Sequence, residues 1–258
     1  CIFKDDLENM WIGTYSGGVD LLPKFQKNFL HYKSSMVAGR GLNNDIVKSI
    51  LEDAEGGLWI GTDGGGINYF DKVSSSFRYY LKDNTINSVG SNNNHCMIEV
   101  NRDILAFGYH RGGFDFFNRK TGKFRNFMPE VGNPNSVSYF TVSSLYKDNK
   151  GNLWIGTWGG GLNCFNIKTN KFTIYQLNHN DPTSINSNVI YDVDQDKEGK
   201  LWIATEHGLD LFNEKQNTFT HYLCDTAMNE RAYSIYVDYK NTIWVGTLGG
   251  GLKLLDKK

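Results

Sequence analysis

The side chains best suited to binding occur at one recurring place in the sequence, four residues after a repeated tryptophan or its equivalent. Six different residues occupy that place: Tyr15, Asp63, His110, Trp158, Glu206 and Leu248. Aromatic rings stack on the C–H face of a sugar, and carboxylate or imidazole groups bond its hydroxyls. Because the flanking residues are nearly constant, this variable position predicts a recognition surface. A solvated loop is the alternative for any single member.

Two copies depart most from the others and add candidate groups. Tyr109-His110-Arg111 replaces the usual Thr-x-Gly, and Glu206-His207-Gly208 is one residue shorter than its counterparts. The Arg111 guanidinium can hold a carboxylate or sulfate through two hydrogen bonds. The predicted ligand-binding residues are Tyr15, Asp63, His110, Arg111, Trp158, Glu206 and His207.

A repeat must position these residues. The pentapeptide Leu58-Trp59-Ile60-Gly61-Thr62 recurs as Leu153-Trp154-Ile155-Gly156-Thr157, and four looser copies complete the series. The tryptophan or its equivalent is Trp11, Trp59, Ala106, Trp154, Trp202 and Trp244, so successive copies lie 48, 47, 48, 48 and 42 residues apart. An aspartate stands six residues before the tryptophan in five copies: Asp5, Asp53, Asp148, Asp196 and Asp238. A near-constant period of this length indicates a repeat architecture.

Each copy predicts four short strands, A to D, with alternating apolar residues and glycine-containing turns. We predict an all-β fold, a β-propeller of four-stranded antiparallel blades. A β-sandwich is the competing all-β fold, but it gives no reason for six copies of one motif. The blade repeats are expected in one propeller domain over residues 1–258, at about 1–33, 43–80, 93–127, 137–175, 188–222 and 230–256.

The same architecture separates framework residues from recognition residues. The tryptophans lie in strand B beside β-branched neighbours, so they are expected to pack between adjacent blades. The B–C and D–A loops of a propeller share one face, which would gather the variable residues there. The D–A loops are long and rich in asparagine, which either satisfies turn backbone or bonds a ligand; the sequence leaves both open.

Catalysis and metal binding have less support. His110, Glu206 and His207 could converge as an acid and a base, as in lyases built on propellers, but no motif anchors them. Asp192-x-Asp194-x-Asp196 is similar to the start of a calcium loop. Lys197 stands where such a loop needs glycine and Ile203 where it needs a bidentate glutamate. We therefore predict no metal, no cofactor and no catalytic residue.

Composition excludes several classes of protein. Lys plus Arg is 27 and Asp plus Glu is 28, so the chain lacks the basic excess of a nucleic-acid binder. No apolar run is long enough to span a bilayer, and no signal or transit peptide is visible. The four cysteines, Cys1, Cys96, Cys164 and Cys224, form no C-x-x-C pair and are expected to be buried, unpaired thiols.

Both ends of the repeat pattern are incomplete. Ile2-Phe3-Lys4-Asp5 matches the second half of strand A, and the last copy has no strand D. Because unpaired strand edges invite association, we expect this chain to be a segment of a longer protein.

The full pattern, D-x-x-G-x-L-W-I-G-T-x-x-G-G-L-x-x-F, resembles the two-component regulator propeller repeat, and Leu153 to Phe165 is almost a consensus copy. The resemblance covers essentially all of the chain. It implies the periplasmic sensor region of a membrane-bound hybrid histidine kinase of the Bacteroidetes type, in a ring that usually has seven blades. Its implied ligand is an oligosaccharide fragment.

The resemblance also implies partners. These are the remaining blades and domains of the parent chain and a possible homodimer, whereas neither nucleic acid nor direct membrane insertion of this segment is expected. The kinase would lie outside the segment. Two alternatives remain open: a protein-interaction scaffold, or a polysaccharide-acting lyase or hydrolase.

Overall fold

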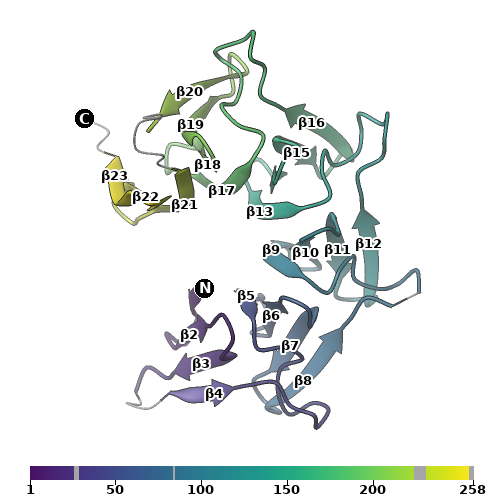
Figure 1. The fold of residues 1–258 in the computed structure, drawn as a ribbon. Helices are drawn as coiled ribbons and strands as arrows, with labels where there is room; N and C mark the ends of the chain where they lie inside the picture. Colours follow the sequence, from purple (N-terminus) through teal and green to yellow (C-terminus); the bar gives the residue numbers. More distant parts are fainter. Residues whose placement is uncertain (26–28, 84, 224–230, 256–258) are drawn as a thin grey trace. The chain divides into compact units, whose positions relative to one another are not determined.

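A computed structural model describes residues 1–25, 29–83, 85–223 and 231–255. Every regular element within these ranges is a β-strand. The strands form five four-stranded sheets and one three-stranded sheet, and in each sheet consecutive strands pair antiparallel. The chain divides into two compact units, residues 1–127 and 128–258, with three sheets in each (Figure 1).

Unit 1 contains blades 1 to 3. Blade 1 is β1 (Ile2–Lys4), β2 (Met10–Gly13), β3 (Val19–Leu22) and β4 (Leu30–Tyr32). Blade 2 is β5 (Val47–Glu52), β6 (Leu58–Thr62), β7 (Ile67–Asp71) and β8 (Ser76–Tyr80). Blade 3 is β9 (Asn94–Asn101), β10 (Ile104–Tyr109), β11 (Phe114–Asn118) and β12 (Lys123–Phe127).

Unit 2 contains blades 4 to 6. Blade 4 is β13 (Val142–Lys147), β14 (Asn152–Thr157), β15 (Leu162–Asn166) and β16 (Lys171–Tyr175). Blade 5 is β17 (Ile190–Gln195), β18 (Leu201–Thr205), β19 (Gly208–Asn213) and β20 (Thr218–Tyr222). Blade 6 is β21 (Arg231–Val237), β22 (Ile243–Leu248) and β23 (Gly251–Leu255).

The predicted all-β propeller blade is confirmed. The first two strands of blade 6 pair with Tyr236 opposite Trp244. That residues 1–258 form one domain remains a prediction.

The repeated tryptophan packs between neighbouring blades, as predicted. The Trp59 ring centroid of blade 2 lies 5.6 Å from Phe107 and 5.4 Å from Phe117 of blade 3. In unit 2, Trp154 of blade 4 lies 5.4 Å from Phe212 of blade 5. Side chains of this size account for a large share of buried apolar area, so these contacts hold each unit together.

The aspartate six residues before each tryptophan serves that packing. Asp53 accepts hydrogen bonds through Oδ1 from the backbone N–H of Glu55 (3.0 Å) and Gly57 (2.9 Å). Its Oδ2 accepts a hydrogen bond from Trp59 Nε1 at 2.7 Å. The same indole bond recurs from Trp11, Trp154, Trp202 and Trp244 to the aspartate of its own blade. One carboxylate thus closes the A–B turn and fixes the indole. We call this end of the blades, with the A–B and C–D turns, the turn edge.

The expectation that the cysteines are buried is wrong for Cys1, which is exposed because it precedes the first strand at a sheet edge. Cys96 and Cys164 are half-buried, and none of the three is in a disulfide. Cys224 lies outside the described residues.

Candidate ligand-binding site

The B–C and D–A loops meet at the opposite end of the blades, which we call the loop edge. In unit 1 the Asp63 N–H donates to the Ile46 carbonyl just before strand A of its own blade (2.9 Å). Gly64 and Gly66 N–H donate to the Asn92 carbonyl in the loop that enters blade 3 (both 2.9 Å). The B–C loop of blade 2 is therefore tied to two D–A loops, and within unit 1 the predicted sharing of one edge is confirmed.

Unit 2 repeats this arrangement. Trp158 N–H donates to the Thr141 carbonyl (3.1 Å), and Gly159 and Gly161 N–H donate to the Asn188 carbonyl (both 2.9 Å). The glycines are required by geometry. Gly161 has φ of 79°, and a Cβ there would lie 2.1 Å from the Tyr175 carbonyl oxygen. The loops therefore have a fixed backbone, and their variable side chains project from a defined frame.

Strand A carries a β-bulge where it begins at the loop edge. Val47 pairs with Thr62 and Ser49 with Gly61, so Lys48 between them has no cross-strand partner. The same shift occurs in blades 3 to 6, and the extra residues are Lys48, His95, Ser143, Tyr191 and Tyr233. Bulges redirect side chains and are common beside functional sites. Four residue types among five blades at one structural position make this a second variable column.

The bulge and loop columns meet in unit 1. Lys48 Nζ lies 3.8 Å from Asp63 Oδ2 and 5.5 Å from the centroid of the Tyr15 ring. The Tyr15 side chain is 76% exposed, so its ring face is available to a ligand. Lys48 therefore joins two predicted site residues from neighbouring blades.

Two imidazoles continue this surface into blade 3. The rings of His95 and His110 stack with centroids 5.7 Å apart and an interplanar angle of 21°. Burial lowers the pKa of His95 to about 4, helped by the positive charges of His110 and Lys48, while Asp63 opposes the shift. His95 is therefore neutral at physiological pH and offers one donor and one acceptor.

Arg111 occupies a backbone position that blades 2, 4 and 6 give to glycine. Its φ is 54°, in the left-handed region where Gly64 and Gly159 have 100° and 130°. A non-glycine residue there costs about 1 kcal/mol. The side chain is exposed at the loop edge. Retaining a strained arginine at a tight turn is typical of a functional position.

The loop edge of unit 2 is aromatic. Trp158 contacts Tyr191 edge to face at 6.4 Å, and Tyr191 lies 4.9 Å from Tyr233, which is 52% exposed. Glu206 Oε1 forms an ion pair with Arg231 at 3.5 Å. His207 Nδ1 lies 2.9 Å from the Asn186 carbonyl oxygen, which anchors this imidazole to the D–A loop.

The structure thus groups the predicted residues by unit. Tyr15, Asp63, His110 and Arg111 lie on the three B–C loops of unit 1, and Trp158, Glu206 and His207 lie on two B–C loops of unit 2. Their role in binding stays a prediction. The bulge residues were not among the residues predicted from sequence. A signal for them was visible, because each of Lys48 and Tyr191 directly follows an aliphatic residue, Val47 or Ile190, that is similar between copies.

The acidic triplet has structural partners. Asp192 accepts a hydrogen bond from the Ile235 N–H (2.9 Å), and Asp194 accepts one from the Val237 N–H (3.1 Å), so both link blade 5 to blade 6. Burial raises the pKa of Asp192 to about 6. Among the described residues, no group of three His, Cys, Asp or Glu side chains is arranged to hold a metal ion.

Comparison with known families identifies the repeat. The model of the "two component regulator propeller" family matches residues 41–64, 137–159, 184–207 and 227–249. Four segments of the chain are therefore similar to two-component regulator propeller repeats. Each match ends just beyond the pentapeptide, so it contains the framework that holds the loop edge.

Solved structures with this fold include extracellular domains of a two component system and a one component system. The extracellular domain of BT3049 from B. thetaiotaomicron, assigned as a hybrid two component system, is 26% identical with a TM-score of 0.80. The match covers 100% of this chain and 33% of that chain. The extracellular domain of BT4673 from the same organism, assigned as a one component system, gives 24% and 0.80 over 100% and 35%. The chain therefore spans about a third of the length of each of those proteins.

A more distant match shows the fold alone. Virginiamycin B lyase from Staphylococcus aureus is 14% identical with a TM-score of 0.73, over 99% of this chain and 80% of that chain. The comparison with curated proteins gave no match. Within the described residues, no helix is long and apolar enough to cross a membrane.

Proposed function

We propose that this chain is a ligand-sensing part of a two-component sensor histidine kinase, that it is periplasmic, and that it binds oligosaccharide fragments at its loop edge. The observation that carries the proposal is the pairing of two variable columns, bulge and B–C loop, on an otherwise repeated framework. The similarity to extracellular domains of Bacteroides sensors supports the location and the sensing role.

Each unit offers its own chemistry for a glycan. Unit 1 presents an ammonium, a carboxylate and a neutral imidazole, at Lys48, Asp63 and His95, so it can both donate to and accept from sugar hydroxyls. Unit 2 presents the rings of Trp158, Tyr191 and Tyr233, which suit the C–H faces of pyranose rings.

Signal relay follows from differential binding. A ligand changes a sensor only by binding one conformation more tightly than another. We propose that an oligosaccharide favours one arrangement of this chain with the other domains of the parent protein or with a second protomer. The membrane helix and kinase of the parent protein would transmit that change.

The described contacts favour binding over catalysis. Glu206 is paired with Arg231, and His207 is anchored to the Asn186 carbonyl, so both groups have framework partners rather than each other. The lyase similarity concerns the fold only.

Isothermal titration calorimetry against neutral and acidic glycan fragments tests the proposal. We expect at least one fragment to bind, and we expect Lys48→Met to weaken binding to unit 1, or Tyr191→Ala to weaken binding to unit 2, at least tenfold. The matched control is Glu214→Gln, an exposed turn-edge substitution that should leave the titration unchanged. No heat with any glycan, or loop-edge variants that bind normally, would contradict the proposal. Chromatography of glycans after incubation tests the lyase alternative, for which we expect no new product.

One exposed face bears on the predicted partners of this chain. The outer face of blade 6 exposes Tyr236 (65%), Leu252 (67%) and Leu254 (54%). In blades 4 and 5 the corresponding face packs against the next blade. We propose that the remaining blades of the parent chain cover this face. Light scattering of the segment and of the parent ectodomain tests it: a monomeric ectodomain with these residues protected is expected, and a homodimer through them is the competing outcome.

A further inference from the structure

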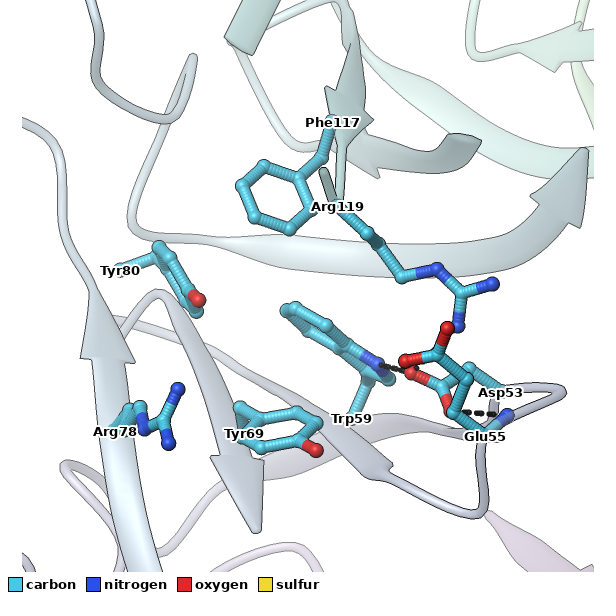
Figure 2. Close-up of a pocket in the computed structure, with 8 residues that line it drawn as sticks. All are labelled: Asp53, Glu55, Trp59, Tyr69, Arg78, Tyr80, Phe117 and Arg119. Atoms are coloured by element: carbon cyan, nitrogen blue, oxygen red, sulfur yellow. Dashed lines mark hydrogen bonds and ion pairs between the residues drawn. The ribbon is translucent and has the colours of Figure 1, made fainter. Parts of the chain in front are cut away.

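The turn edge of unit 1 holds a cavity of about 160 Å³ between blades 2 and 3. We propose that this cavity is a second binding site, and that its ligand is a single neutral sugar ring. Figure 2 shows its lining: Asp53, Glu55, Trp59, Tyr69, Arg78, Tyr80, Phe117 and Arg119. An apolar cavity of about 150 Å³ takes one six-membered ring, so the volume suits a monosaccharide unit and not a longer glycan.

Arg119 is the first reason to expect a ligand. Its side chain is only 8% exposed. Nη1 lies 3.0 Å from Asp53 Oδ2, and Nη2 lies 3.9 Å from Glu99 Oε1. These contacts are ion pairs by distance, yet the directions of the N–H bonds leave all three guanidinium nitrogens without a hydrogen bond to any described residue. Buried donors without acceptors are costly, and a ligand oxygen would satisfy them.

The charges around Arg119 select a neutral ligand. Asp53 and Glu99 already balance its positive charge. Glu55 adds a third carboxylate at the mouth, and Arg78 adds a second cation there. With three acids against two bases, an anion would meet net repulsion. Hydroxyl groups fit better, because they accept from Arg119 and donate to Glu55.

The walls supply the apolar part of the recognition. Tyr69 and Tyr80 are half-buried, and their rings line the cavity beside the deeply buried Trp59 (Figure 2). Arg78 lies over the Tyr69 ring, 5.7 Å from its centroid, and closes one side. Aromatic walls with a few polar groups at fixed places are the usual lining of a small-molecule site.

The equivalent position in unit 2 has a much smaller cavity, which serves as a comparison. The cavity between blades 4 and 5 has about 30 Å³, although it has the same Asp148–Trp154 pair. Glu214 replaces Arg119 there and pairs with Lys150. Between blades 1 and 2, Lys72 stands at this position and bonds Asp5 (3.1 Å) and Glu52 (2.5 Å). Of the three, only Arg119 combines burial, unbonded nitrogens and an open cavity.

This inference is independent of the proposed function, because the cavity lies at the turn edge and the oligosaccharide surface at the loop edge. Each can therefore fail alone. The test uses the six tryptophan indoles, whose N–H groups report separately in a ¹⁵N-labelled protein. The signal that disappears in Trp59→Phe belongs to the indole beside the proposed site, and the signal that disappears in Trp154→Phe belongs to its equivalent in unit 2.

The probes are methyl α-D-glucopyranoside, methyl α-D-mannopyranoside and methyl β-D-galactopyranoside, with D-glucuronate as the charged comparison. We expect at least one neutral pyranoside to shift the Trp59 indole signal saturably and to leave the Trp154 signal in place. No shift at Trp59 up to tens of millimolar, a shift with glucuronate alone, or equal shifts at both indoles would each overturn the proposal.

Two substitutions locate the binding. Arg119→Met is expected to weaken binding at least tenfold, and the other indole signals report whether the variant folds. Tyr69→Leu keeps the framework, because Leu21 and Leu211 stand opposite Trp11 and Trp202 in blades 1 and 5. Unchanged affinity in a folded Tyr69→Leu protein would overturn the site. Tyr191→Ala should leave the Trp59 titration intact, and Tyr69→Leu should leave oligosaccharide binding at the loop edge intact.

Discussion

The two ends of the blades have opposite designs. At the turn edge the same aspartate bonds the same indole in five blades, with Asp Oδ2 to Trp Nε1 distances between 2.7 Å (Trp59) and 3.1 Å (Trp244). At the loop edge the backbone bonds repeat, but the bulge and B–C loop side chains differ from blade to blade. We therefore expect stability to come mostly from the turn edge, and we propose that recognition comes mostly from the loop edge. Substitutions at the two edges should separate these properties.

The largest effect is expected at the turn edge. Trp154→Ala removes a buried ring that contacts Phe212 of the next blade, so it should lower the free energy of unfolding by about 3–5 kcal/mol. Urea unfolding of unit 2, followed by near-ultraviolet circular dichroism, measures this. Trp158→Ala at the loop edge is the matched control with a smaller cost. Equal costs for the two would remove the distinction between the edges.

Asp148→Asn should cost about 2 kcal/mol, because the amide brings a donor toward the Trp154 indole and loses the charge that its turn N–H groups bond. The measurement is the same urea unfolding. Asp181→Asn on a D–A loop, fully exposed, is the comparison. A loss below about 0.5 kcal/mol would show that the indole bond carries little stability.

His95 should make unit 1 sensitive to acid. Its pKa of about 4 in the folded chain lies below the ordinary 6.5, so its contribution to stability is complete above pH 6.5 and is lost as pH falls toward 4. The stability advantage of wild type over His95→Gln should therefore shrink by about 2 kcal/mol on acidification across that window. Comparing the two proteins removes the effect of other carboxylates. If the stability difference between wild type and His95→Gln did not change with pH, His95 would not be buried from solvent.

Tyr191→Ala should lower glycan affinity at least tenfold, about 1.4 kcal/mol of binding free energy, and change unfolding by less. The bulge leaves this residue without a cross-strand partner, and its ring contacts Trp158 and, in our proposal, a ligand. Calorimetry gives the change in glycan affinity, and urea unfolding of the same preparation gives the change in the free energy of unfolding. A stability loss larger than the affinity loss would make Tyr191 a framework residue.

The smallest effect is expected at Arg111. Arg111→Gly relieves a backbone φ of 54° and should raise stability by about 1 kcal/mol, while weakening any ligand that the guanidinium holds. Thermal unfolding measures the change in stability, and calorimetry measures the change in ligand affinity. Lower stability with unchanged affinity would show that the arginine serves the turn.

The blade was predictable because its signals are local. Strand alternation, glycine turns and a period of 47 or 48 residues over most copies specify a meander that must stack on its neighbours. The spacing of six between Asp53 and Trp59 was visible, but its meaning needs a side-chain geometry that only the folded A–B turn supplies.

The site was predictable in part. The B–C loop residues stood out because their neighbours hardly vary, whereas the bulges could not be foreseen, since a bulge is defined by the register with a partner strand. Arg119 illustrates a further limit. Its ion-pair partner Asp53 comes from the preceding blade, and a lysine or a glutamate stands at the same position elsewhere.

The absence of a ladder partner for the bulged residues has an evolutionary consequence. A residue that takes no part in cross-strand pairing can be exchanged without disturbing register, so Lys48 or Tyr191 is open to replacement by almost any amino acid. A duplicated gene could thus acquire a new chemical preference through a handful of point mutations while its scaffold remained intact.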